Sequence, residues 1–327
     1  MDRPRPPGDP QRPQHPQHLS RRSALRHGLL AIVGSSCARL ARALPDPQPL
    51  ITKPIPSTGE RLPAVGLGTD SFEASDRDAI RAEITRMHEL GGTVIDTAAA
   101  YGDSEALIGD ALASAGIRDA MFLATKLTGS GASDYFGGDA RGPEGSLKRS
   151  LDRLRTHRLD LLQVHNLDGV DTLIPLLRKW KQAGTIRYYG VTTSRVSQHE
   201  DMAEVMRKYP LDFIQVDYSI ANRDAEKTIF PLALERRIAV LANLPLVHGR
   251  LMRQVRSIPL PSWAGDLGIT SWSQFLLKYV ISHPAVTCAI PGSTRVAHLE
   301  DNQKAARGVL PDAAMRVRME QYFKEKV

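Results

Sequence analysis

Residues 76–115 read DRDAIRAEITRMHELGGTVIDTAAAYGDSEALIGDALASA, and they contain one complete pattern from which the rest of the chain can be read. Two amphipathic segments, Asp76–Leu90 and Ser104–Ala115, flank a short apolar run, Val94–Asp96, which has the character of a buried strand. Helical and strand-like segments that alternate in this way are typical of a parallel sheet covered by helices.

The same alternation continues through the chain. Leu147, Leu151 and Leu154 recur at helical spacing within the predicted helix Gly145–Leu154, and Leu173–Ala183 is a further predicted helix. The strands that we predict are Ala64–Gly68, Val94–Asp96, Met121–Lys126, Leu159–His165, Ile186–Thr193, Phe213–Asp217, Ala239–Asn243 and Ala289–Pro291. Eight strand–helix units predict an α/β fold, and more specifically a single (β/α)8 TIM barrel. A doubly wound sheet is disfavoured, because Gly66-Leu67-Gly68-Thr69 lacks the third glycine of a dinucleotide fingerprint.

Shorter features surround the predicted barrel. Ser57-Thr58-Gly59-Glu60 is a turn between two extended runs, which predicts an N-terminal β-hairpin. The long segments Gly129–Gly142 and Leu244–Thr270 should be rim loops, and with the C-terminal segment Leu310–Val327 they should determine the substrate. Four aromatic residues either form a substrate wall or only pack these loops: Trp263, Trp272, Tyr135 and Phe136.

The net charge of +7 lies almost entirely at the N-terminus. Residues 1–43 hold eight arginines, no lysine and two aspartates, which leaves residues 44–327 with a net charge of +1. The predicted barrel is therefore nearly neutral, and the basic pI gives no support to nucleic-acid binding. The two cysteines, Cys37 and Cys288, cannot form a disulfide framework or a thiolate metal cluster. We therefore expect no metal site.

Residues 1–43 resemble an export signal. Ser20–Arg26 contains the pair Arg21-Arg22, and the short apolar run Gly28–Gly34 follows it, as in a twin-arginine signal. Cleavage after Ala43 would release a mature chain without a transmembrane segment, because the apolar run is too short to span a bilayer. Lipidation at Cys37 is the second alternative, and an unprocessed tail on a cytoplasmic protein is the third. We expect export, with a periplasmic location.

Ionisable side chains lie where consecutive predicted strands end. Asp96, Lys126 and His165 end the second, third and fourth strands, and Tyr101 lies in the loop after the second strand. The carboxyl ends of barrel strands form one mouth, so these four side chains should converge there. Each residue alone has a plain structural explanation. Three consecutive strands that all end in an ionisable residue favour a catalytic site.

The four side chains suit proton transfer to a carbonyl oxygen. A tyrosine has a pKa of about 10, and a buried ammonium group such as that of Lys126 should bring it down. Asp96 would pair with Lys126 in the desolvated site, and His165 would orient and polarise a substrate carbonyl.

These motifs together resemble the aldo-keto reductase superfamily. The matching runs, in the family's order, are Gly66–Thr69, Ile95–Gly102, Ala124–Lys126, Leu159–His165 and Ile290–Ser293. The resemblance covers about Leu62 to Asn302, and it implies that Asp96, Tyr101, Lys126 and His165 form a catalytic tetrad with Tyr101 as the general acid or base.

The resemblance also implies an NADPH/NADP+ cofactor and a small carbonyl substrate. Thr192, Thr193 and Gln215 would contact the nicotinamide amide, and Tyr218 would stack on the ring. Leu246 and Gly249 would lie over the pyrophosphate. The remaining expected contacts are with the adenosine half of the cofactor: Ser293, Arg295, Asp301 and Asn302.

Two departures from the family pattern affect the choice of cofactor. Gly292 replaces a frequent lysine, and His298 stands where an arginine often binds the 2′-phosphate. The preference for NADPH then depends on Ser293 and on Arg295 at a helix start, and NADH is not excluded.

Two other functions remain open at this point. Lys126 at a strand end would also suit a Schiff-base aldolase. A non-catalytic NADP(H)-binding module that senses redox state would keep the same nucleotide contacts. The oligomeric state and the physiological substrate cannot be read from the chain.

Overall fold

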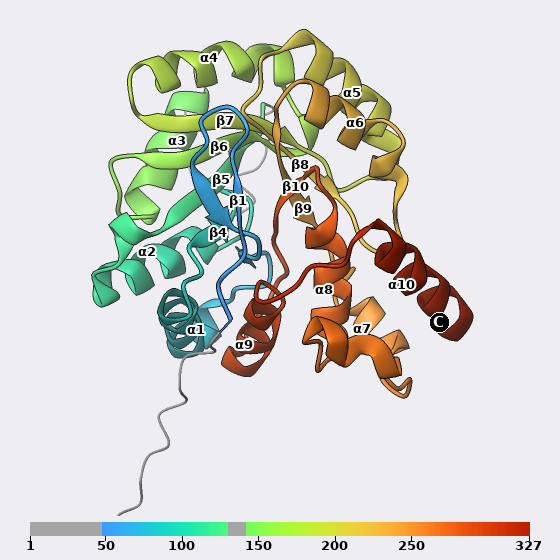
Figure 1. The fold of residues 1–327 in the computed structure, drawn as a ribbon. Coiled ribbons are helices and arrows are strands. Elements are labelled where there is room, and N and C mark those ends of the chain that lie inside the picture. The colour runs from blue at the N-terminus through green and yellow to red at the C-terminus, as the bar shows by residue number, and fades with distance from the viewer. Residues whose placement is uncertain (1–47, 130–141) are drawn as a thin grey trace, which may run out of the picture. The chain divides into compact units, whose positions relative to one another are not determined.

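The computed structural model describes residues 48–129 and 142–327. Eight parallel strands form the centre of this body, with helices packed around them (Figure 1). The strands are β3 (Leu67–Gly68), β4 (Val94–Asp96), β5 (Phe122–Leu127), β6 (Leu159–Val164), β7 (Ile186–Thr192), β8 (Phe213–Asp217), β9 (Ala239–Asn243) and β10 (Val286–Ala289).

The sheet closes on itself between its first and last strands. Each strand pairs with the next along the chain, and parallel bridges Val65↔Ala289 and Gly68↔Gly292 join β3 to β10. A β-carbon on Gly68 would lie 2.8 Å from the carbonyl oxygen of Ile290, so the close approach at this seam requires glycine. The predicted (β/α)8 barrel is confirmed.

Helices follow the strands and cover the outside of the barrel. Their bounds are α1 (Arg77–Glu89), α2 (Ser104–Ala115), α3 (Gly142–Arg153), α4 (Val170–Gln182), α5 (His199–Lys208), α6 (Ile229–Glu235), α7 (Arg250–Gln254), α8 (Trp272–Ser282), α9 (Val296–Lys304) and α10 (Ala313–Lys326). In α4 the apolar stripe Leu173, Ile174, Leu177 and Trp180 is buried against the sheet layer, as helical periodicity requires. No helix in the described ranges is long and apolar enough to cross a membrane.

A hairpin covers the amino-terminal end of the barrel. Strands β1 (Thr52–Pro54) and β2 (Arg61–Pro63) pair antiparallel, which confirms the predicted hairpin. Ile55 and Leu62 are buried in one apolar cluster with residues at the beginning of β5 and β8, such as Phe122 and Phe213. The hairpin therefore fills one end of the barrel and leaves the carboxyl ends of the strands as the open mouth.

Some predicted bounds differ from the structure, most clearly in the last strand and in the segment Leu244–Thr270. The last strand is Val286–Ala289 and not Ala289–Pro291, because the residues that pair with β9 begin just after the turn that ends α8. The segment Leu244–Thr270 is not irregular throughout, since it contains α7 and the 3-10 helix Ser262–Leu267. Leu251 and Leu267 are buried, so packing gives this segment regular structure that its sequence does not indicate.

Candidate active site

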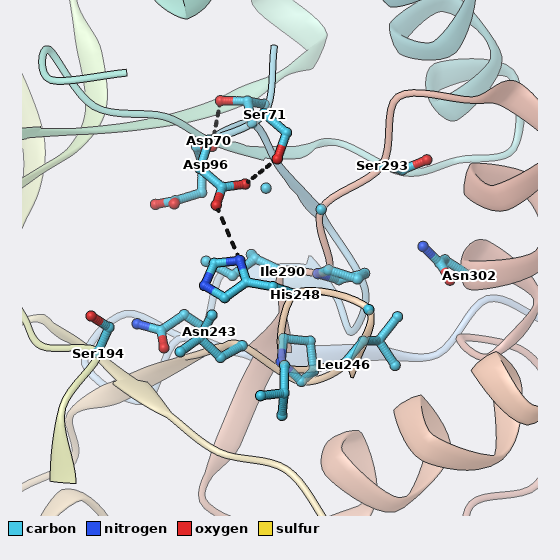
Figure 2. Close-up of a pocket in the computed structure, with 18 of the residues that line it drawn as sticks. Asp70, Ser71, Asp96, Ser194, Asn243, Leu246, His248, Ile290, Ser293 and Asn302 are labelled. Carbon is cyan, nitrogen blue, oxygen red and sulfur yellow. Dashed lines mark hydrogen bonds and ion pairs between the residues drawn. The ribbon is translucent and has the colours of Figure 1, made fainter. Parts of the chain in front are cut away.

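A cavity of about 720 Å³ opens at the carboxyl ends of the strands. Its lining includes residues from β3, β4, β7, β8 and β9, together with the segments that follow β3, β4, β6, β7, β9 and β10. Figure 2 shows part of this lining, with Asp96 and Asn243 at strand ends. In a barrel of this kind, side chains from different strands meet here.

Asp96 and Lys126 form a buried ion pair in the wall of this cavity. Lys126 Nζ lies 2.6 Å from Asp96 Oδ2 and also donates to the carbonyl oxygen of Thr97 at 2.7 Å. The two residues are 3% and 1% exposed. Burial works against the charge of Lys126, but Asp96 and Tyr101 hold the pKa of Lys126 above its ordinary value. The lysine therefore remains a cation at neutral pH.

Tyr101 lies against this pair. Lys126 Nζ is 4.9 Å from the centre of the Tyr101 ring and also acts on the phenol hydroxyl through a hydrogen bond. Burial raises the pKa of Tyr101 by more than Lys126 lowers it. Lys126 lowers the pKa of Tyr101 as expected, but desolvation is the larger effect and the pKa lies above its ordinary value.

His165 completes the group. It begins the 3-10 helix His165–Leu167 directly after β6, and its ring meets the Tyr101 ring edge-on, with centroids 5.8 Å apart. Asn166 and Leu167 have φ of 53° and 61°, and the Asn166 N–H donates to Thr192 Oγ1. Burial, followed by the charge of Lys126, lowers the pKa of His165 to about 4, so the ring is neutral at pH 7. The structure thus brings all four predicted residues together.

The three residues predicted to contact the nicotinamide amide do not all line the cavity. Thr192 and Gln215 line the cavity, and Gln215 Nε2 is buried with no hydrogen-bond partner among the described residues. Thr193 is fully buried, and its hydroxyl donates to Gln198 Oε1 at 2.6 Å. The Thr193 side chain therefore serves the loop after β7 and does not line the cavity.

Tyr218 is not where the resemblance implied. Its ring is fully buried with Phe230 and Tyr279, and its hydroxyl donates to Glu226 and accepts from Arg316 Nη2. Successive side chains of a strand point to opposite faces, so Tyr218, three positions after Gln215, faces the helices. The predicted ring stack on this tyrosine was wrong.

The loop after β9 crosses beside the cavity. Leu246 and Gly249 line the cavity at the predicted positions. Leu244, Val247 and His248 all have φ near +50°, a backbone conformation that costs energy for residues other than glycine.

A histidine–aspartate pair connects this loop to the segment after β3, which also lines the cavity. His248 Nδ1 lies 3.6 Å from Asp70 Oδ2, in the segment after β3, and Figure 2 shows the two side chains pointing toward one another. Neither residue had been singled out from the sequence, and only the position of Asp70 after the Gly66–Thr69 motif gave a signal.

The far end of the cavity lies against α9. Ser293, Asp301 and Asn302 line it, whereas the Arg295 side chain is exposed and is not part of the lining. The Asp301 carboxylate accepts hydrogen bonds from Ser271 Oγ and Gln274 Nε2, both at 2.6 Å, so the structure of α8 holds it in place.

The predicted aromatic wall is not present in the described part of the rim. Trp263 and Trp272 pack on Phe275 and Tyr322, and neither lines the cavity. No residue of Leu310–Val327 lines it either, because α10 packs on α8. Tyr135 and Phe136, with most of Gly129–Gly142, lie outside the described residues, as does the leader 1–43 with Cys37.

The described residues contain no group of histidine, cysteine, aspartate and glutamate side chains that could hold a metal ion. Cys288 is fully buried inside the barrel, and burial raises the pKa of its thiol. A thiolate nucleophile is not expected there.

Comparison with known proteins gives one consistent result. The family model described as aldo/keto reductase family matches residues 64–318. Methylglyoxal reductase YeaE of Escherichia coli is 30% identical over 250 residues, covering 74% of this chain and 84% of that protein. Aldo-keto reductase yakc [NADP(+)] of Schizosaccharomyces pombe is 26% identical over 309 residues, covering 79% and 87%. A crystal structure of an aldo/keto reductase from Klebsiella pneumoniae in complex with NADP and acetate matches with a TM-score of 0.67 and 26% identity, covering 81% and 93%.

Proposed function

The chain belongs to the aldo/keto reductase family, and we propose that it is an NADP(H)-dependent oxidoreductase that transfers a hydride between nicotinamide and an aldehyde or ketone, or the corresponding alcohol. The proposal depends above all on the contact of Tyr101 with Lys126 and His165 in the wall of one cavity.

The cavity fits a dinucleotide in shape and in polarity. It extends from Asp96 and Tyr101, past the loop after β9, to Ser293 and Asn302. Near its far end, the first amides of α9 point outward from a helix N-terminus, where anionic groups bind favourably. NADP in the related Klebsiella structure supports the same cofactor here. Gln215 and Thr192 would hold the nicotinamide end, and Leu246, Gly249 and Ser293 would lie along the phosphates.

The protein's own groups manage the proton. When bound, the reduced nicotinamide supplies a hydride to the carbonyl carbon. His165, neutral at pH 7, can donate a hydrogen bond that orients the carbonyl oxygen. Tyr101 gives its proton to that oxygen, and Lys126 stabilises the negative charge left on the phenol. Asp96 keeps Lys126 charged and in position. In the oxidation direction Tyr101 acts as the base.

The same ion pair argues against a Schiff-base aldolase. A lysine that forms a carbinolamine must be neutral to attack a carbonyl. Here Asp96 and Tyr101 hold the pKa of Lys126 above its ordinary value, so the amine is protonated at neutral pH.

Substitution of Tyr101 tests the catalytic role. In Tyr101→Phe we expect kcat for NADPH-dependent reduction to fall by about two to four orders of magnitude, because the proton donor is lost. The Kd for NADPH should stay within about twofold. Stopped-flow and steady-state assays with methylglyoxal and a panel of small aldehydes and ketones would measure both quantities.

Tyr209→Phe is the matched control, because the Tyr209 hydroxyl bonds Asp171 on the helical exterior. It should leave kcat unchanged. Normal turnover in Tyr101→Phe would disprove the role of Tyr101. Tight NADPH binding by the unmodified protein without any turnover would favour the redox-sensing alternative.

We also propose that residues 1–43 direct export by a twin-arginine route, with a periplasmic location for the mature enzyme. The pair Arg21-Arg22, the apolar run Gly28–Gly34 and the small residues of Ala41-Arg42-Ala43 support this proposal. Such a route would carry the barrel with its cofactor already bound.

A further inference from the structure

Asn243 is a polar side chain of the cavity lining that the catalytic proposal leaves without a role. It is the last residue of β9 and lies opposite Asp217 in the parallel register with β8. Its Nδ2 donates to the carbonyl oxygen of Thr193, at the end of β7, at 2.9 Å. The side chain therefore reaches across the end of β8, and Figure 2 shows it at the edge of the cavity close to Ser194.

This contact fixes the orientation of the amide. A backbone carbonyl can only accept a hydrogen bond, so the nitrogen of the Asn243 amide must face Thr193 and the oxygen must face away from it. Oδ1 of Asn243 is buried, and no donor among the described residues reaches it. A buried carbonyl oxygen without a donor is unfavourable, and a ligand N–H placed there would satisfy it.

The surroundings of Asn243 narrow down which part of a ligand could supply that N–H. Gln215, on the adjoining strand, and Thr192 line the same wall. The lining of the same cavity contains Asp96 and Tyr101, so on the proposed function the reacting end of the cofactor lies among these residues. Among the described residues, Tyr218 does not supply an aromatic ring at this strand end, because it faces the helices. At that end of a nicotinamide cofactor, the N–H donors are those of its primary carboxamide.

We propose that Asn243 is a cofactor-positioning residue whose Oδ1 accepts a hydrogen bond from the carboxamide nitrogen of nicotinamide. This inference rests on the proposed function and adds a contact on the β9 side to those of Gln215 and Thr192. Asn243 then helps to set the rotation of the ring about its glycosidic bond, and thereby the face presented to the substrate.

A cofactor analogue that lacks only this donor provides the test. The 3-acetylpyridine analogue of NADP+ keeps the carbonyl group and replaces the amide nitrogen with a methyl group. Calorimetric titration of the purified full-length protein should give a Kd for the analogue roughly three- to tenfold weaker than for NADP+. In Asn243→Leu the Kd for NADP+ should weaken by a similar factor, whereas the Kd for the analogue should change by less than about twofold.

Two further variants keep the test decisive. Ser194→Ala also changes the cavity lining and should leave the ratio of the two dissociation constants as in the unmodified protein. If Asn243→Leu does not fold, Asn243→Ala should show the same loss of discrimination.

Equal weakening of both ligands in the Asn243 variants, or equal binding of both by the unmodified protein, would overturn the inference. These results would indicate that a water molecule or a ribose hydroxyl satisfies Oδ1. Failure of the unmodified protein to bind any nicotinamide nucleotide would overturn the proposed function itself, so the two failures are distinguishable.

Discussion

Glu83 is a carboxyl group that folding buries completely. It lies on the inner face of α1, is 0% exposed, and neither of its carboxyl oxygens has a hydrogen-bond partner among the described residues. Burial raises its pKa to about 7, although the nearby Ser293 hydroxyl acts in the opposite direction. The proposed catalytic chemistry does not use this group, so its effect should be on stability.

The raised pKa of Glu83 predicts a stability that falls with rising pH. The unfolded chain releases this proton near pH 4.5 and the folded protein near pH 7, so stability is lost between these values. Glu83→Gln has no proton to lose. It should match the unmodified protein near pH 4.5 and exceed its free energy of unfolding by about 2–4 kcal/mol at pH 8.

Urea denaturation at several pH values would measure this difference. Glu89→Gln is the control, because Glu89 lies on the same helix with an exposed carboxylate paired to Arg86. The difference in free energy of unfolding between Glu89→Gln and the unmodified protein should change little over the same pH range. A constant difference between Glu83→Gln and the unmodified protein from pH 4.5 to 8 would show that Glu83 is not the titrating group.

At the scale of elements, the loop after β9 has several residues at positive φ, and His248 in this loop pairs with Asp70, an ion pair when the histidine is protonated. His248 and Asp70 are 67% and 39% exposed, so their attraction is weak and screened by salt. The pair is relevant to the cofactor because it joins two separate segments of the cavity lining (Figure 2).

We therefore expect His248→Ala to speed the release of NADPH by about two- to fivefold at low ionic strength. The difference from the unmodified protein should shrink at high salt. Asp70→Asn should have a similar effect, and the double variant should be no faster than either one. Stopped-flow displacement of bound NADPH would measure these rates.

Lys208→Ala removes an exposed ion pair, with Asp171, that is not part of the cavity, and this variant is expected to release NADPH at the normal rate. Strictly additive effects of the His248 and Asp70 substitutions would mean that the pair does not hold the loop.

At the scale of the whole molecule, the body from Pro45 to Val327 is a compact unit in itself. The catalytic group, the cavity and the hairpin that fills the barrel all belong to it. A chain of residues 44–327 should therefore bind NADPH and turn over as well as the full-length protein.

Processing of the leader can be tested separately from activity. Expression in a bacterium with a twin-arginine pathway should yield a periplasmic protein whose intact mass corresponds to a chain that begins at Leu44. Replacing both Arg21 and Arg22 with lysine should retain the full-length chain in the cytoplasm. Lysine at Arg3 and Arg5 is the matched control and should not affect export. A full-length mass in the cytoplasm, or a mass that shows lipid on Cys37, would contradict this prediction.

The sequence was sufficient to predict the barrel and the gathering of Asp96, Tyr101, Lys126 and His165. The apolar runs that end in or just before Asp96, Lys126 and His165 form neighbouring strands. These runs could be predicted because their apolar pattern and their order can be read directly from the chain. Parallel strands bring their carboxyl ends to one side whatever the details of packing. Tyr101 followed from its position in the loop after β4.

Only the tertiary structure could assign the partners of the remaining groups. It turned Tyr218 toward α10 through Arg316, left the Asn243 oxygen without a donor, and paired Asp70 with His248. It also raised the pKa of Tyr101 where the sequence suggested a lower one, and buried Glu83 behind Ser293. The physical reason is that pairing and burial depend on segments distant in the chain, whereas strand and helix periodicity depends on neighbours. The order of residues thus determined which groups gather at the barrel mouth, and packing determined their protonation and which of them remain free to bind a ligand.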